Sequence, residues 1–164
     1  MDTSTTPAAM REQLIQGLQD DLAREYTAII QYVIFSQTLG GAGYMKLAGE
    51  LERHAHQELD HALAIARQLD YFGAYPVHAP ALVRVSANNE EMLWFDLQAE
   101  DETVRNYRER IHQAQHLGEY ALAEVLQEIV RQEQDHQIDL ATALGVVPDA
   151  QQRQGQGPST AQSS

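Results

Sequence analysis

Two sets of side chains that can bind metal ions occur in this chain, and 75 positions separate each residue from its counterpart. The first set is Glu25, Glu58 and His61, and the second set is Glu100, Glu133 and His136. In each set one glutamate stands alone, and the other lies three residues before the histidine, so that this pair shares one face of a helix. Two lone glutamates with two Glu-x-x-His pairs are typical of a di-iron or di-manganese centre in a four-helix bundle. The pattern predicts a two-metal centre that reacts with oxygen or peroxide.

The predicted ligand set combines four carboxylates with two imidazoles. Such an oxygen-rich set suits iron or manganese better than zinc in a closed structural site. In the simplest assignment, Glu58 and Glu133 bridge both metal ions, and one histidine binds each ion. Glu25 and Glu100 are then terminal ligands. Without metal, four buried acids are costly, so we expect them to be partly protonated or hydrated.

Two aspartates recur at the same spacing, one helical turn before the lone glutamates. These are Asp21 and Asp96. Because a metal-bound histidine usually needs an acceptor for its other ring nitrogen, we expect Asp21 and Asp96 to accept hydrogen bonds from the two histidines. Another repeated pair, Asp60 and Asp135, points away from the neighbouring ligands on a helix. We expect this second pair at the surface or at an interface.

Two tyrosines, Tyr32 and Tyr107, lie two helical turns after the lone glutamates, again at the same spacing. They could donate a hydrogen bond to a carboxylate or supply an electron near the metals, and we count Tyr32 among the catalytic residues. The alternative is that both are core tyrosines with satisfied hydroxyl groups. Of the remaining histidines, His54 and His56 lie near the mouth of the predicted centre.

The apolar residues around these ligands recur at helical spacing, which predicts four long helices. Their predicted ranges are about 7–38, 44–71, 88–116 and 119–144. Asn88, followed three residues later by Glu91, predicts a capping box at the start of the third helix. Short turns follow helices one and three, whereas residues 73–87 form a long, aperiodic crossover. We therefore expect an all-α, antiparallel four-helix bundle with one long crossover between helices two and three.

These elements divide the 164 residues into a polar leader (1–7), one bundle domain (8–144) and a polar tail (145–164). The tail has no core-forming residues, so we predict that it is disordered. The chain has no cysteine, which excludes disulfides, zinc–thiolate sites and thiol catalysis. A net charge of −13 argues against a nucleic-acid partner, because phosphate contacts need clustered lysine and arginine. We find no signal peptide and no stretch of membrane-spanning length, and therefore expect no membrane partner and a cytoplasmic location.

Four stretches of the chain resemble the bacterioferritin branch of the ferritin-like superfamily. They are LAREYTAIIQY (22–32), HQELDHALAIARQLDYFG (56–73), EEMLWFDLQAEDETVRNYRERI (90–111) and RQEQDHQIDL (131–140). The resemblance implies a ferritin-like bundle whose metal ligands are Glu25, Glu58, His61, Glu100, Glu133 and His136. It also implies a ferroxidase that binds two iron ions per subunit and oxidises Fe(II) with oxygen or peroxide. The ferric product would be stored as a mineral inside a homo-oligomeric shell of 24 subunits.

The chain departs from this family pattern at three places. Leu59 stands where haem-binding members have a methionine, so we predict no haem. Arg53 and Gln57 stand where the family often has histidine and aspartate, which alters the usual path of iron. The tail replaces the short fifth helix that packs at the four-fold axis, which leaves a dimer or a smaller shell as alternatives to 24 subunits.

Three functions are consistent with these residues. The first is a ferroxidase that detoxifies and stores iron. The second is a non-storing di-iron or di-manganese oxidase or peroxidase of smaller oligomeric state, which the altered mouth and the missing fifth helix favour. The third is a helical interaction protein in which the carboxylates are vestigial. Two intact copies of the ligand pattern argue against the third hypothesis.

Overall fold

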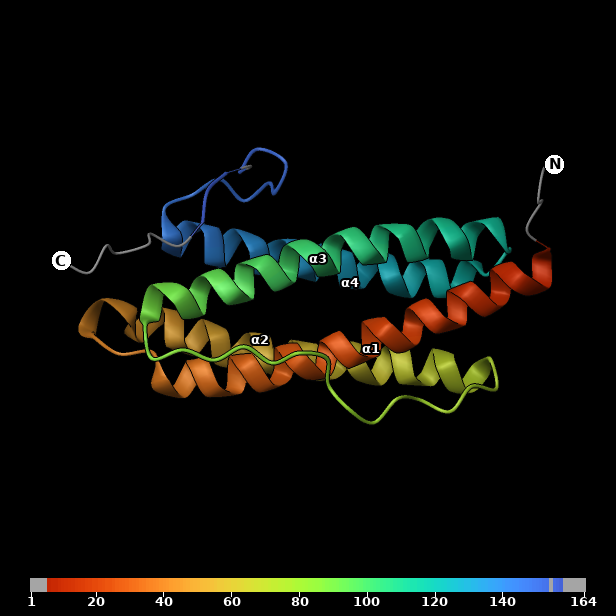
Figure 1. Ribbon diagram of the computed structural model, residues 1–164, viewed down its shortest axis with the longest axis horizontal. Coiled ribbons are helices and arrows are strands. Elements are labelled where there is room, and N and C mark those ends of the chain that lie inside the picture. The colour runs from red at the N-terminus through yellow and green to blue at the C-terminus, as the bar shows by residue number, and fades with distance from the viewer. Residues whose placement is uncertain (1–5, 154, 158–164) are drawn as a thin grey trace.

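The computed structural model describes residues 6–153 and 155–157 as a bundle of four long helices (Figure 1). The helices are α1 (Pro7–Thr38), α2 (Met45–Tyr71), α3 (Asn89–His116) and α4 (Tyr120–Leu144), and a short 3-10 turn, η1, spans Ala42–Tyr44. Helix α1 packs against α2 and α3, and α4 packs against α3 and α2. In each of these pairs the two helices run in opposite directions (Figure 1). The predicted all-α bundle with a crossover between helices two and three is confirmed, and the helix ends agree with the prediction within one residue. The predicted leader lies largely outside the described residues.

The start of α1 follows from its first residues. The Thr6 side chain accepts a hydrogen bond from the backbone N–H of Ala9 at 3.3 Å, and Pro7 occupies the first helical turn. Such a side-chain acceptor satisfies one of the free N–H groups at a helix start, and proline is tolerated there because its missing N–H is not needed.

The start of α3 differs from the predicted capping box. The Asn88 side chain accepts from the backbone N–H of Glu91 at 2.9 Å, as predicted. The Glu91 carboxylate, however, accepts from the hydroxyl of Ser86 instead of the backbone of Asn88. The Asn88 backbone N–H donates to the same hydroxyl at 3.0 Å. Ser86 therefore links the two groups that a capping box would join directly.

The crossover from α2 to α3 runs along α1 and is held there by polar contacts. Gln19 of α1 donates to the carbonyl of Tyr75 at 2.8 Å and accepts from the N–H of Val77 at 2.7 Å. Gln31, three turns further along α1, accepts from the N–H of Arg84 at 2.9 Å. The crossover is thus fixed beside the middle of α1, and Figure 1 shows it following this helix.

The apolar core is divided into two clusters by a layer of buried polar residues. One cluster, at the end of the bundle where α1 begins, includes Leu14, Leu18, Leu22, Ile65, Leu69 and Leu126. The other, at the opposite end, includes Tyr32, Phe35, Leu51, Trp94, Leu97 and Leu140. Burying a large apolar side chain stabilises the fold by roughly 1.5–3 kcal/mol. Two such clusters can therefore hold a costly polar layer between them.

The tail folds back onto the bundle over the part that the structure describes. The Arg153 side chain is only 5% exposed, and its guanidinium donates to both carboxylate oxygens of Asp101 in α3, at 2.9 and 2.5 Å. It also donates to the carbonyl of Pro148 at 2.9 Å. The paired charge of Arg153 and the side chain of Val146, which packs against the apolar cluster at that end, hold residues 145–153 against the bundle, where a disordered segment was predicted. The rest of that prediction falls mainly on residues outside the described ranges.

Among the described residues, no helix combines the length and the apolar character that crossing a membrane requires. The expected cytoplasmic location stays a prediction.

Candidate metal centre

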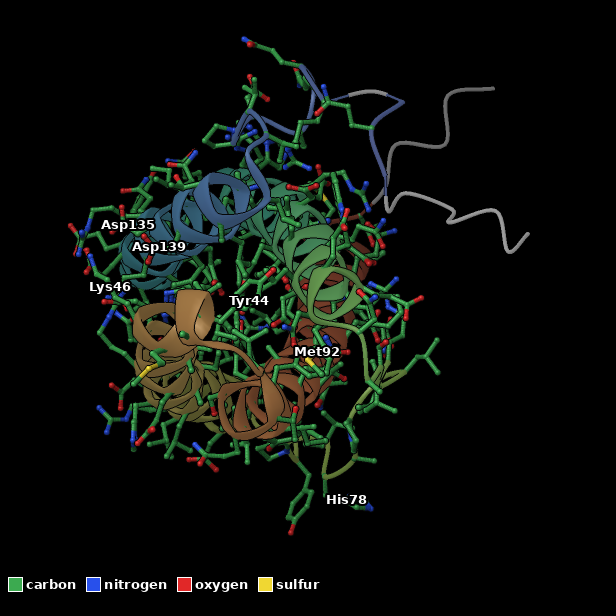
Figure 2. The ribbon with its side chains drawn as sticks, turned by 90° about the vertical axis from the view of Figure 1, so that its left-hand side faces the viewer. Tyr44, Lys46, His78, Met92, Asp135 and Asp139 are labelled. Atoms are coloured by element: carbon green, nitrogen blue, oxygen red, sulfur yellow. The ribbon has the colours of Figure 1, made fainter. Side chains whose placement is uncertain are left out.

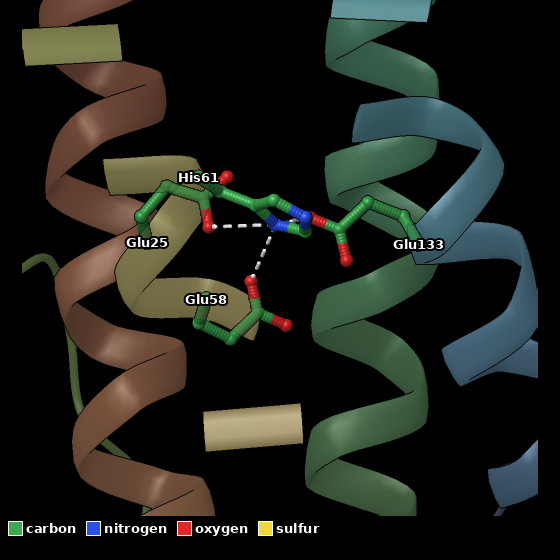
Figure 3. Close-up of side chains that lie close together, drawn as sticks. All are labelled: Glu25, Glu58, His61 and Glu133. Atoms are coloured by element: carbon green, nitrogen blue, oxygen red, sulfur yellow. Dashed lines mark hydrogen bonds and ion pairs between the residues drawn. The ribbon is translucent and has the colours of Figure 1, made fainter. Parts of the chain in front are cut away.

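The polar layer between the two apolar clusters contains all six predicted ligands. They form two groups, in each of which one ligand atom from every residue lies within 4.8 Å of the others. One group is Glu25, Glu58, His61 and Glu133, and the other is Glu58, Glu100, Glu133 and His136. All six side chains are buried. The four helices thus bring together residues up to 111 positions apart in the chain, and Figure 3 shows the first group.

Glu58 and Glu133 belong to both groups. Nδ1 of His61 lies 3.1 Å from Oε2 of Glu58 and 3.2 Å from Oε1 of Glu133. Nδ1 of His136 lies 2.9 Å from the other oxygen of Glu58 and 3.0 Å from the other oxygen of Glu133. Each of these two carboxylates therefore directs one oxygen toward each histidine, which is the arrangement that a pair of bridging ligands requires.

Glu25 and Glu100 each approach only one histidine. The Glu25 carboxylate lies 3.6 Å from Nδ1 of His61, and the Glu100 carboxylate lies 3.5 Å from Nδ1 of His136. The centre consequently has two halves with equivalent ligands, one glutamate and one histidine each, and two carboxylates shared between them.

Several ligand atoms are buried without a partner in hydrogen-bond geometry. They are Oε2 of Glu25, Oε1 of Glu58, both carboxylate oxygens of Glu133, and Nδ1 of His136. Such atoms are costly in a protein interior unless a cation or a donor compensates them. Because they all belong to the same two groups of carboxylates and imidazoles, they fit a pair of divalent metal ions.

Burial and mutual repulsion shift the pKa values of the terminal glutamates. Burial, followed by the negative charges of Glu58 and Glu133, raises the pKa of both Glu25 and Glu100 well above the usual range. Burial would also raise the pKa of Glu58, but hydrogen bonds from both histidines lower it below its usual value. The raised pKa values of Glu25 and Glu100 agree with the expectation that buried acids are partly protonated when no metal ion neutralises them, whereas the lowered pKa of Glu58 favours its ionised form.

Each terminal glutamate is held by a tyrosine from the opposite hairpin. The Tyr32 hydroxyl of α1 donates to Glu100 of α3, and the Tyr107 hydroxyl of α3 donates to Glu25 of α1. Burial, followed by the charge of the glutamate it contacts, raises the pKa of each tyrosine. Both phenols are therefore protonated donors at neutral pH. The contacts with carboxylates fit the predicted role and equally the alternative of core tyrosines with satisfied hydroxyl groups, since both rings belong to the apolar clusters. A role in electron supply stays a prediction.

The acceptors for the outer ring nitrogens are glutamines, and the prediction of Asp21 and Asp96 in this role is wrong. Nε2 of His61 lies 3.1 Å from Oε1 of Gln132, and Nε2 of His136 lies 2.9 Å from Oε1 of Gln57. Both nitrogens face the space between α2 and α4, whereas the two aspartates belong to α1 and α3. The missed signal was present, because both glutamines open the repeated motif Gln-Glu-x-Asp-His.

The two aspartates are buried and have other partners. Asp21 accepts from Nε of Arg110 at 2.9 Å, and Asp96 accepts from the amide of Gln31 at 2.9 Å. Burial raises the pKa of Asp21 to about 6, although the nearby positive charge of Arg110 opposes this. Burial raises the pKa of Asp96 to about 8, although the hydrogen bond from Gln31 opposes this.

His54 lies next to the centre, although it belongs to neither ligand group. It is completely buried, and its ring stacks on that of His136 with 3.9 Å between the centroids. Burial, then the positive charge of His136, lowers the pKa of His54 to about 2. His54, Glu50 and Asp139 form a third cluster of potential ligands, but Arg53 already contacts Glu50 at 2.8 Å and Asp139 at 3.2 Å. The guanidinium of Arg53 thus supplies the positive charge for this cluster.

Other candidate residues lie outside the centre. Asp60 and Asp135 are exposed, as predicted, and so is His56. The view along the bundle shows Asp135 and Asp139 at the outer side of α4 (Figure 2).

A cavity of about 480 Å³ connects the centre with the surface between α1, α3 and the crossover. Its lining includes all four ligand carboxylates and also the exposed residues Leu82 and Gln98. Arg24 and Glu102, which form an ion pair at 3.2 Å, contribute to the same lining. The cavity therefore offers small molecules and ions a route to the ligands.

Comparison with known proteins gives results that agree with this geometry. Residues 15–150 match the ferritin family of sequences, described as a ferritin-like domain. Over 140 residues, 81% of this chain, the sequence is 26% identical to the bacterioferritins of Brucella melitensis biotype 1 and Streptomyces coelicolor, of which it covers 87% and 84%. A crystal structure of a ferritin-like, diiron-carboxylate protein from Bacillus anthracis superposes with a TM-score of 0.78 and 33% identity, over 81% of this chain and 96% of that one.

Proposed function

The chain belongs to the ferritin-like family, and from this premise we propose that it is a ferroxidase that oxidises Fe(II) and stores the product. The observation that carries the proposal is the pair of shared carboxylates. Glu58 and Glu133 each direct one oxygen to each half of a centre whose halves have equivalent ligands. Two metal ions held in this way would lie close enough to react with one molecule of oxygen or peroxide.

We assign the roles of the ligands as follows. Glu58 and Glu133 would bridge the two iron ions, and His61 and His136 would each bind one ion through Nδ1. Glu25 completes the half with His61. Two bound Fe(II) ions would supply one electron each to the oxidant, and manganese is the alternative metal for the same ligand set.

The remaining ligand, Glu100, completes the half with His136, and the tyrosines keep both terminal carboxylates in position. Tyr107 holds Glu25 and Tyr32 holds Glu100, so neither carboxylate has to be reoriented when an ion arrives. Tyr32 is also the catalytic tyrosine of this proposal, because its phenol contacts Glu100 and its ring lies edge-on to that of His136, with 6.0 Å between the centroids. Its hydroxyl can pass a proton or an electron to the centre.

Access for Fe(II) and for the oxidant is assigned to the cavity between α1, α3 and the crossover. Its carboxylates attract cations, and its volume of about 480 Å³ exceeds what an iron ion or a peroxide molecule requires. On the opposite side, between α2 and α4, Arg53 occupies the cluster of Glu50 and Asp139. Iron would therefore enter and leave on the α1–α3 side.

For the assembly, we propose the 24-subunit shell that encloses a ferric mineral. The relatives named as bacterioferritins support this assembly. We also propose that the chain binds no haem, since Leu59 replaces the methionine. The absorption spectrum of protein expressed with added haem tests this point, and a Soret band of protein-bound haem in the wild type would contradict it.

A smaller, non-storing di-iron oxidase or peroxidase is the second candidate. The specific observation in its favour is the position of Arg53, which places a fixed positive charge beside the centre on the side of α2 and α4. A protein that turns over peroxide without accumulating iron has no need of an iron path on that side.

The test is aerobic loading with Fe(II), followed by measurement of the iron that co-elutes with protein on a sizing column. A ferroxidase that stores iron retains far more than two irons per chain on a large particle, whereas the second candidate retains about two on a small oligomer. The double variant Glu58→Ala with Glu133→Ala should lose rapid oxidation, because both bridging carboxylates are absent. Unchanged oxidation by this variant would reject both candidates.

A further inference from the structure

The two halves of the centre have equivalent ligands but unequal surroundings. On the side of His136, Oε1 of Gln57 accepts two hydrogen bonds, one from Nε2 of the histidine at 2.9 Å and one from Nη1 of Arg53 at 2.8 Å. On the side of His61, Oε1 of Gln132 faces the histidine at 3.1 Å. The amide nitrogen of Gln132 donates to the carboxylate of Glu128 at 3.0 Å. Gln57 is therefore hydrogen-bonded to a cationic side chain and Gln132 to an anionic one.

These outer charges determine the orientation of both glutamine amides. Arg53 can only donate, so the group of Gln57 that faces it must be the oxygen. Glu128 can only accept when ionised, so the group of Gln132 that faces it must be the nitrogen. In both cases the amide oxygen also faces the histidine, whose Nε2 must then carry a hydrogen. Both histidines consequently present Nδ1 to the centre as the ligating nitrogen.

The same contacts polarise the two histidines in opposite directions. The Glu128 carboxylate accepts a hydrogen bond from the amide nitrogen of Gln132, which makes the amide oxygen of Gln132 a stronger acceptor. The stronger hydrogen bond from Nε2 then increases the electron density on His61. A guanidinium that donates to the Gln57 oxygen draws electron density away from it, which weakens its hydrogen bond from His136.

The remaining charges near the two glutamines are similar on both sides. Arg53 is paired with Glu50 and Asp139, and Glu128 is paired with Arg131, which also lies 3.7 Å from Asp135. Each side thus carries one basic and two acidic side chains. The halves therefore differ in the direction of the hydrogen bonds to the glutamines, and in the ring of His54, which stacks on His136. They do not differ in the net charge near the glutamines.

We propose that Gln132 with Glu128, and Gln57 with Arg53, are positioning residues that make the two metal positions unequal. The position formed by His61 and Glu25 binds first and more tightly, and the position formed by His136 and Glu100 binds second. This inference rests on the proposed two-metal centre and concerns the order in which that centre fills.

The experiment is an anaerobic calorimetric titration of the full-length metal-free protein with Co²⁺, monitored in parallel by the visible absorption of the bound ion. The wild type should bind two ions per chain in two separate steps. Glu100→Gln should retain the tighter step, and Glu25→Gln should retain only the weaker one. A single step with two equal sites, or retention of the tighter step by Glu25→Gln, would overturn the inference. Failure of the wild type to bind two ions would instead reject the two-metal centre itself.

The matched variants Gln132→Leu and Gln57→Leu test the positioning role. Loss of an outer partner of a metal-bound histidine typically lowers affinity by about 10–100-fold. Gln132→Leu should weaken the first step and Gln57→Leu the second, each with a changed cobalt spectrum for that step only. An equal effect of both variants on both steps would show a merely structural role and would overturn the assignment.

Two charge variants separate polarisation from orientation. Glu128→Gln should weaken the first step, and Arg53→Met should strengthen the second, each by less than the loss of the glutamine itself. Arg67→Met removes an exposed positive charge from the same helix as Arg53. It serves as the control, and it should leave both steps unchanged. If it strengthens the second step as much as Arg53→Met does, long-range charge and not the contact with Gln57 is responsible.

Discussion

The hydroxyl groups of Tyr32 and Tyr107 donate hydrogen bonds to the buried carboxylates of Glu100 and Glu25. Replacing either tyrosine with phenylalanine keeps the ring but leaves a buried acid without its donor. A buried polar group that loses its partner costs about 1–3 kcal/mol. We expect Tyr32→Phe and Tyr107→Phe each to lower the free energy of unfolding of the metal-free protein by that amount, as measured by urea denaturation. Tyr120→Phe, at an exposed tyrosine, is the control, and equal losses in all three variants would contradict the assignment.

The raised pKa of Asp96 predicts that the free energy of unfolding depends on pH. Burial raises its pKa to about 8 in the folded protein, whereas an unperturbed aspartate has a pKa of about 3.9. Between these values the folded chain holds a proton that the unfolded chain has released. The contribution of Asp96 to stability therefore decreases as pH rises through this window, by at most about 1.4 kcal/mol per pH unit.

The substitution Asp96→Asn tests this dependence, because asparagine can still accept from Gln31 but does not titrate. The metal-free variant should be more stable than the wild type at pH 8, and the difference should shrink toward pH 4. Urea denaturation across this range provides the measurement. The exposed Asp70→Asn is the matched control, and parallel curves for wild type and Asp96→Asn would show that Asp96 does not titrate as expected.

At this scale, the sequence predicts ligands better than it predicts their partners. Glu25 and His61 could be recognised because ligand type and helical spacing are local properties of the chain. The partners of His61 could not be assigned, because the choice between Asp21 and Gln132 depends on which helices face the outer ring nitrogen. His54 was also unassigned, since it has no counterpart in the other half of the repeat.

Among the helices, α1 and α3 meet at a close contact that requires a glycine. A side chain at Gly17 would place its Cβ 2.2 Å from Nε of Arg110, the same nitrogen that donates to Asp21. Gly17→Ala must therefore displace the guanidinium from Asp21, whose other positive neighbour is Arg24 at 3.5 Å. Breaking a buried ion pair costs about 3–5 kcal/mol, and the remaining contact with Arg24 keeps the loss below that. Thermal and urea unfolding of the variant should show a clear loss of stability.

At a second helical glycine we expect the opposite effect of alanine, a gain in stability. Gly49 in α2 is exposed and has free space around the position of a Cβ. Alanine is favoured over glycine inside a helix by about 0.5–1 kcal/mol. Gly49→Ala should therefore stabilise the protein, and a loss of stability as large as that of Gly17→Ala would mean that the Arg110 contact is not the cause.

The helices themselves follow from local signals, and the segments that join or follow them do not. Apolar periodicity and the predicted cap residue Asn88 place the helix ends within one residue. The partner of Glu91 and the docking of Arg153 on Asp101 escaped prediction. Both depend on polar contacts that leave no periodic pattern in the sequence.

For the molecule as a whole, the polar layer predicts that metal ions stabilise the fold. Ligands that bind only the folded state raise its stability by about 2.7 kcal/mol when free ligand is at 100 times the dissociation constant. We expect chelation to lower the melting temperature of the wild type and added Co²⁺ to restore it. The variant Glu58→Ala with Glu133→Ala should show no such response. A Co²⁺ response that survives in the variant would place the metal elsewhere.

The contacts of the tyrosines and glutamines all cross from one half of the repeat to the other. Tyr32 and Gln57 of the first half contact Glu100 and His136 of the second. Tyr107 and Gln132 of the second half contact Glu25 and His61 of the first. Neither helical hairpin can complete a metal position alone, so the two are mutual complements. A chain cut within residues 73–87 should thus yield two fragments that recover cobalt binding only when mixed. The colour of bound cobalt would then report the reassembly of a split protein.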